Sequence, residues 1–167
     1  MKTNNSITRI KIAAAAAAGV LGLMVAAPAP AADSIAVPVS AVVVGVCKFS
    51  TGQSPSVVIA NSGGNIDTSL AGPATGTTNI LYRCTNGTVP VFALSGGATT
   101  TLTCSTPATC GATSMNASMA LTPPASPNGQ GFATDLTLVL DGQITSATYA
   151  GALEGTYTGT TTVTVNP

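Results

Sequence analysis

One stretch of the sequence decides the fold class: Ile35-Ala36-Val37-Pro38-Val39-Ser40-Ala41-Val42-Val43-Val44-Gly45-Val46-Cys47. Every odd position from Ile35 to Val43 is aliphatic, whereas the first even positions are small or polar. A period of two in β-branched residues is typical of a strand with one buried face. We expect this strand either to pair with later strands of its own chain or to dock into another molecule.

The residues before this stretch have the features of an export signal. Lys2, Arg9 and Lys11 form a basic start, and residues 12–27 are apolar but short for a membrane span. Ala29-Pro30-Ala31 provides small residues at a cleavage site. We therefore predict a signal peptide over residues 1–31, in preference to an uncleaved membrane anchor.

Charge is scarce in the remaining chain. Without residues 1–31, the only basic residues are Lys48 and Arg83, which stand against five acidic residues for a net charge of −3. Two cations cannot form a basic patch, so nucleic acid is excluded as a partner. The length fits one domain, whose polar surface must consist mainly of Thr, Ser, Asn and Gly.

Cysteine usage agrees with export. The chain has four cysteines and no histidine, and an even set behind a signal peptide predicts disulfides rather than a metal site. Four cysteines allow three pairings. We favour Cys47–Cys84, which would join two predicted strands, and Cys104–Cys110, which would close a short loop.

Short β-prone runs separated by Gly, Pro, Asn and Ser predict an all-β antiparallel sandwich or barrel. Tight turns are expected at Asn86-Gly87 and Asp141-Gly142. In the last predicted strand, Tyr157, Val163 and Val165 share the face opposite a row of threonines. The expected strands span residues 35–49, 56–60, 78–84, 89–95, 117–122, 135–140, 144–150 and 156–165.

Catalytic chemistry has little support. The usual general base and metal ligand, histidine, is missing, and Asp135 and Asp141 are expected at opposite ends of one strand. Lys48 and Arg83 could pair with acidic residues across strands, but we favour solvated edge charges. The six aromatic residues are predicted to pack in the core. We therefore expect neither an enzyme nor a bound cofactor.

Five stretches of the chain, taken together and in order, resemble the spore coat protein U family, which includes the Csu-type subunits of archaic chaperone–usher pili. The stretches cover most of the sequence after the predicted signal peptide. They are Val39-Ser40-Ala41-Val42-Val43 with Cys47-Lys48-Phe49-Ser50, Leu81-Tyr82-Arg83-Cys84-Thr85-Asn86-Gly87-Thr88, Gly129-Gln130-Gly131-Phe132, Leu136-Thr137-Leu138 with Gly142-Gln143-Ile144, and Gly155 through Pro167.

The resemblance implies an incomplete immunoglobulin-like β-sandwich that is completed by donor-strand exchange. Residues 32–41 would be the donor extension and residues 42–167 the pilin-like domain. The donor side chains would be Ile35, Val37, Val39, Ala41 and Val43. The acceptor groove would be edged by the strand carrying Tyr157, Val163 and Val165, and by the strand that enters Cys47.

The same resemblance implies the partners and the location. A periplasmic chaperone would lend a strand first, and an outer-membrane usher would then join the subunit to copies of itself or to related pilins. The final location would be a surface fibre for adhesion and biofilm. Two alternatives remain: a self-associating coat or matrix protein, and a monomeric secreted binding module whose first strand closes its own sandwich.

Overall fold

The computed structural model describes residues 33–167, so the predicted signal peptide lies outside the described residues. The chain divides into two units, one ending at Ser40 and the other spanning Ala41–Pro167. In the described part of the first unit, residues 33–40, no helix or strand forms and every residue is exposed.

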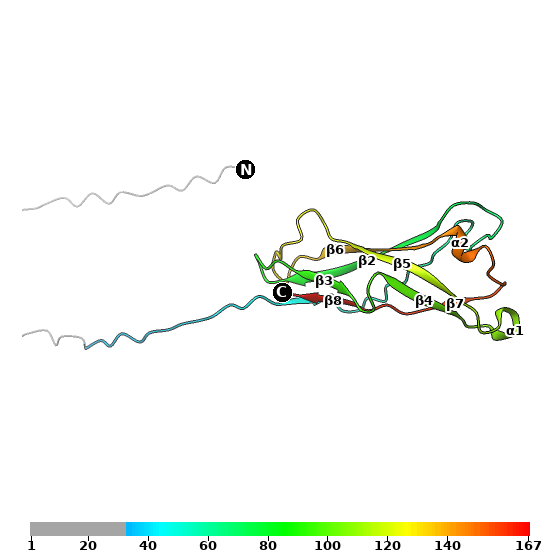
Figure 1. Cartoon of the computed structure of the whole chain (residues 1–167). Coiled ribbons are helices and arrows are strands. Elements are labelled where there is room, and N and C mark those ends of the chain that lie inside the picture. Colours follow the sequence, from blue (N-terminus) through cyan, green and yellow to red (C-terminus); the bar gives the residue numbers. More distant parts are fainter. Residues whose placement is uncertain (1–32) are drawn as a thin grey trace, which may run out of the picture. The chain divides into compact units, whose positions relative to one another are not determined.

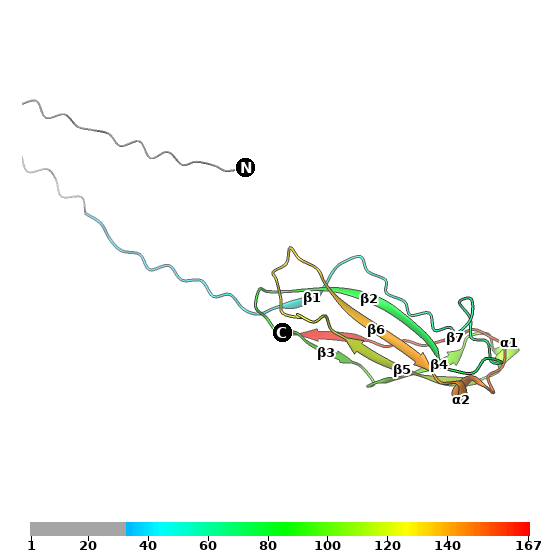
Figure 2. The same cartoon turned by 90° about the horizontal axis from the view of Figure 1, so that it is seen from above.

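The second unit is built on a six-stranded antiparallel sheet, here called the main sheet (Figure 1). Its short outer strands are β1 (Cys47–Phe49) at one edge and β7 (Tyr157–Thr158) at the other. Figure 2 shows the long central strands running side by side. The strand order is β1, β2 (Ala74–Cys84), β6 (Leu136–Ile144), β5 (Ser114–Thr122), β4 (Thr99–Cys104) and β7.

A second, smaller sheet pairs β3 (Val91–Leu94) with β8 (Val163–Asn166). Two one-turn helices complete the elements: α1 (Pro107–Cys110) joins β4 to β5, and α2 (Ser146–Tyr149) follows β6. The fold is therefore all-β with antiparallel sheets, as the sequence predicted.

The core forms on one face of the main sheet because the strand sequences alternate. In β5, Met115, Ala117 and Met119 are buried, whereas Asn116 and Ser118 between them are exposed. The same period of two holds in β2 and β6. The buried hydrophobic cluster comprises Ala74, Ile80, Tyr82, Cys84, Met115, Ala117, Met119, Leu138, Leu140, Ile144 and Tyr149.

Two predicted strands at the start of the domain are largely wrong. Of residues 35–49, only β1 is a strand, and of residues 56–60, only Ala60 makes an isolated bridge, to Thr75. A strand needs a partner for its backbone groups, and the alternating pattern alone does not provide one.

Two more predictions are corrected near the end of β6. The Asp141-Gly142 pair is not a turn but lies within β6, where Gly142 is buried. The predicted strand 144–150 is wrong, because Ile144 is the last residue of β6 and α2 begins just after Thr145. Tyr149 on α2 is fully buried, and its hydroxyl donates to the carbonyls of Leu70 and Gly72.

The predicted strand 156–165 is divided between the two sheets. Tyr157 lies in β7 of the main sheet, whereas Val163 and Val165 lie in β8 of the small sheet. Alternation holds on both sides of the exposed Gly159, since these three residues are half-buried and the even-numbered threonines are exposed. Strand β4 was not predicted, because its sequence TTTLTC carries a single large aliphatic residue.

Both favoured disulfides are confirmed: Cys47–Cys84 and Cys104–Cys110. The first joins register partners on β1 and β2. Asn86-Gly87 is also confirmed as a turn position, with φ 80° at Gly87.

Candidate functional site

An open groove of about 1260 Å³ lies over the inner face of the main sheet. Its floor is apolar and comes from the four central strands of this sheet. The floor residues are Thr78 and Ile80 from β2, Leu140 and Ile144 from β6, Met115, Ala117 and Met119 from β5, and Thr100 and Leu102 from β4.

The first wall of the groove is the extended segment of residues 55–59. It is anchored at both ends on β2. Before it, the Gln53 side chain bonds to both backbone groups of Leu81, with distances of 2.6 Å and 2.7 Å; after it, Ala60 forms its bridge with Thr75. Val57 and Ile59 are half-buried, whereas Val58 between them is 64% exposed.

The second wall of the groove is formed by residues 153–163. It starts in a loop, joins the main sheet through β7, and leaves it at Gly159 to reach β8. At Gly159 the chain passes so close to β4 that a Cβ atom would meet the Thr101 carbonyl oxygen. The hydroxyl of Thr161, further along this wall, is buried with no hydrogen-bond partner among the described residues.

Both walls present backbone groups that lack partners. Within residues 33–167, no hydrogen bond involves the backbone of residues 54–59 or of residues 159–161. Unpaired N–H and C=O groups in extended chain are a template for another strand. The groove thus combines an apolar floor with two walls that each have backbone groups without a hydrogen-bond partner among the described residues.

The predicted acceptor residues only partly coincide with this groove. Tyr157 and Val163 line it, but Val165, which pairs with Phe92 in the small sheet, does not. From the strand that enters Cys47, only Phe49 reaches the groove. The first wall was missed, although its Val-Val-Ile sequence signals an extended apolar segment.

The predicted donor residues are exposed. The exposed fraction is 88% for Ile35, 72% for Val37, 92% for Val39 and 82% for Val43, and Ala41 is exposed too. Ile35, Val37 and Val39 belong to the first unit and Ala41 and Val43 to the second. Aliphatic side chains at such exposure leave apolar surface to be buried by a partner.

The charged residues lie outside the groove floor. Arg83 is not a free edge charge as predicted, because it forms an ion pair with Asp135 and donates to the Phe132 carbonyl over 2.8 Å. Hydrogen bonds from Arg83 and Ser50 lower the pKa of Asp135 to about 2. Phe132 is not in the core as predicted, since it is 40% exposed and lies 4.7 Å from the Lys48 ammonium.

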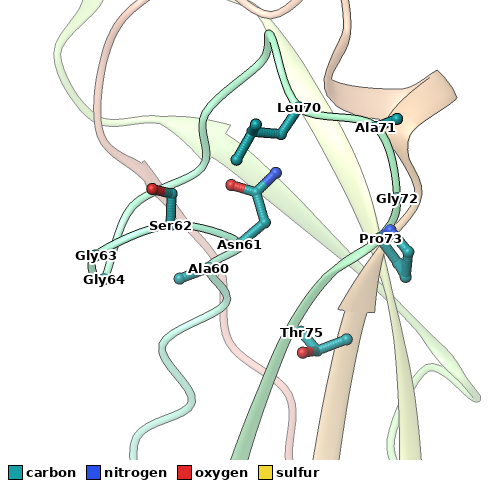
Figure 3. Close-up of a pocket in the computed structure, with 10 residues that line it drawn as sticks. All are labelled: Ala60, Asn61, Ser62, Gly63, Gly64, Leu70, Ala71, Gly72, Pro73 and Thr75. Carbon is teal, nitrogen blue, oxygen red and sulfur yellow. The ribbon is translucent and has the colours of Figure 1, made fainter.

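A second, shallower pocket of about 610 Å³ lies among loops (Figure 3). Residues 60–64 and 70–73 frame it, with Thr75 at the start of β2 below them. Its lining contains no titratable side chain, and its one amide, Asn61, is committed to Asp67 and Tyr149. The pocket therefore offers no chemistry beyond loop packing.

Other signatures and the comparisons add no further site. In residues 33–167, no group of His, Cys, Asp or Glu side chains is arranged to bind a metal ion, and no helix is long and apolar enough to cross a membrane. Comparisons with protein-family models, curated proteins and solved structures found no match to this chain. The groove is therefore the feature from which a function is inferred.

Proposed function

We propose that this protein is a secreted structural subunit of a chaperone–usher pilus that polymerises by donor-strand exchange. Its domain would be an incomplete immunoglobulin-like sandwich. Residues 33–43 of one subunit would fill the groove of the next and complete it. The resulting surface fibre would serve adhesion and biofilm formation.

The groove carries this proposal. Its apolar floor matches a strand with aliphatic side chains on one face, and its two walls have unpaired backbone groups to bond such a strand from both sides. Residues 33–43 supply that pattern with Ile35, Val37 and Val39. Burial of four or five aliphatic side chains would contribute about 6–12 kcal/mol before ordering costs are subtracted.

A structural role also suits the distribution of polar groups. The groove floor is mainly aliphatic, with hydroxyls of Thr78 and Thr100 and no charged side chain. An exposed apolar groove is an aggregation hazard for an exported protein. We therefore propose a periplasmic chaperone that covers the groove first and an outer-membrane usher where the exchange takes place.

The test is the assembly of the full chain after export. Val37→Asp and Val39→Asp place a charge on the face that would be buried, so each is expected to abolish multimers seen by native mass spectrometry. Ala36→Asp introduces the same charge on the opposite face of the same segment and is the matched control. It should leave assembly largely intact.

The concentration dependence separates the alternatives. A subunit that exchanges strands forms multimers that grow with protein concentration. A monomeric binding module would stay monomeric, and Val37→Asp would then lower its stability instead. A coat or matrix protein would associate equally well in the Val37→Asp, Val39→Asp and Ala36→Asp variants. Each of these last two results contradicts the proposed function.

A further inference from the structure

The loop closed by the Cys104–Cys110 disulfide lies against the second wall of the groove. Its backbone is ordered by α1 and by a bond from the Cys104 N–H to the Thr113 carbonyl, with a distance of 3.1 Å. Cys110 is fully buried although it lies in a connection between two strands. A buried cysteine in such a short loop indicates that the loop packs against something.

The partner of this loop is the chain at residues 155–156. The Thr156 carbonyl accepts from the Ser105 N–H at 2.7 Å and from the Ser105 hydroxyl at 2.9 Å. The Thr156 N–H in turn donates to the Thr106 hydroxyl at 3.1 Å. Both backbone groups of Thr156 are therefore held by two adjacent residues of the loop.

The packing at Gly155 is equally close. A Cβ atom at this position would collide with the Cys110 sulfur, and it would lie 2.9 Å from the Thr106 hydroxyl oxygen. Gly155 has no positive φ that would by itself require glycine. The disulfide sulfur thus occupies the space that any larger residue would need.

These contacts matter because the wall has few other anchors on this side. Strand β7 pairs with β4 through only two residues, Tyr157 and Thr158. Residues 159–161 make no backbone hydrogen bond to any described residue, and the next anchor is Thr162, whose two backbone groups bond to Ser95 just before β8. The width of the groove near Tyr157 is therefore set largely by the disulfide loop.

We propose that the Cys104–Cys110 loop positions the second wall of the groove and so determines how long an inserted strand is retained. This inference rests on the proposed function. No residue of the loop lines the groove, so the loop would act through Thr156 and Tyr157. If the second wall were released from the loop, it would no longer lie at the distance at which it can bond to an inserted strand. The inserted strand would then dissociate faster.

The experiment measures subunit exchange between labelled and unlabelled multimers of the full chain. In the variant Cys104→Ala/Cys110→Ala, exchange is expected to be about tenfold faster than in the wild type. Thr106→Val keeps the disulfide but removes the bond to the Thr156 N–H, so a smaller acceleration is expected. Ala108→Ser is the matched control, because Ala108 is an exposed residue of the same loop whose methyl group makes no hydrogen bond.

A double-mutant cycle distinguishes positioning from general loss of stability. Gly155→Ala should accelerate exchange in the wild-type background, and it should have a smaller effect once the Cys110 sulfur is removed. If the effects of Gly155→Ala and of removing the disulfide are independent, this inference is wrong. It is also wrong if both the disulfide variant and the Thr106 variant exchange at the wild-type rate. Neither result contradicts the proposed function. A wild-type chain that forms no multimers overturns the proposed function and this inference with it.

Discussion

Gly76 on β2 and Gly142 on β6 are register partners, and the first wall of the groove lies directly on this pair. The two missing side chains leave a bare patch in the main sheet. The Val58 carbonyl approaches Gly76, while the side chains of Val57 and Ile59 cover Gly142. The distance between the first wall and the sheet therefore depends on two glycines.

This relationship predicts unequal effects for two alanine substitutions. In Gly76→Ala the new methyl would meet the backbone of Val58, which cannot move without displacing the wall, so a loss of about 1–3 kcal/mol is expected. In Gly142→Ala it would meet only side-chain atoms of Val57 and Ile59, at 3.0–3.3 Å, so the loss should be smaller. Urea unfolding measures both, and equal losses would contradict this explanation.

At the second wall, Gly159→Ala is expected to destabilise the fold by about 1–3 kcal/mol. A Cβ atom there would lie 2.8 Å from the Leu102 side chain and still closer to the Thr101 carbonyl oxygen. Gly151→Ala is the matched control, because no atom lies within 4 Å of the place that its new methyl would occupy, and its φ is not positive. It should unfold at nearly the wild-type urea concentration.

Tyr149→Phe should cost about 1–3 kcal/mol through one lost hydroxyl. This hydroxyl accepts from the Asn61 amide at 3.0 Å and donates to the carbonyls of Leu70 and Gly72, so three buried or partly buried groups lose a partner. Tyr157→Phe provides the comparison, since its hydroxyl is near solvent and the loss should be smaller. Thermal unfolding would rank the two, and the reverse order would contradict this assignment.

The Arg83–Asp135 pair predicts a loss of stability in acid. Because hydrogen bonds from Arg83 and Ser50 hold the folded-state pKa of Asp135 at about 2, below the ordinary 3.8, the ionised carboxylate favours the folded state. Its contribution is complete above about pH 4 and is lost as the pH falls toward 2.

The test follows the urea midpoint of the wild type and of Asp135→Asn from pH 6 to pH 2. The difference between them should be constant above about pH 4 and should shrink below it. Ser50→Ala removes one of the two hydrogen-bond donors to Asp135. Its urea midpoint above about pH 4 should therefore lie between those of the wild type and Asp135→Asn. A difference that stays constant down to pH 2 would refute the role of this carboxylate.

Several features followed from local sequence because they depend on local chemistry. Short β-prone runs at residues 117–122 and 135–140 predicted β5 and β6, and Asn86-Gly87 predicted a turn with positive φ. The disulfide Cys104–Cys110 followed from a short loop. By contrast, α2 was mistaken for a strand, since the burial of Tyr149 depends on carbonyl groups almost 80 positions earlier in the chain.

The candidate site was predicted in outline but not in its walls. Tyr157 and Val163 were expected at an acceptor edge and do line the groove, whereas most of the first wall lies in residues 56–60, which were predicted as an ordinary strand. Alternation shows that a segment has an apolar face, but it does not show which backbone will pair with it. Nothing in the sequence around Gly159 predicted that the last segment changes from one sheet to the other there.

The sequence by itself determined an antiparallel all-β domain and its disulfides, because these follow from short β-prone runs, from turn residues and from cysteine spacing. Only the tertiary structure decided that the main sheet has an uncovered apolar groove, and that two extended segments leave their backbone groups unpaired beside it, within the described residues. Pairing between strands is a long-range property. It depends on which segments pack against one another, and here close contacts at Gly76, Gly155 and Gly159 determine that packing.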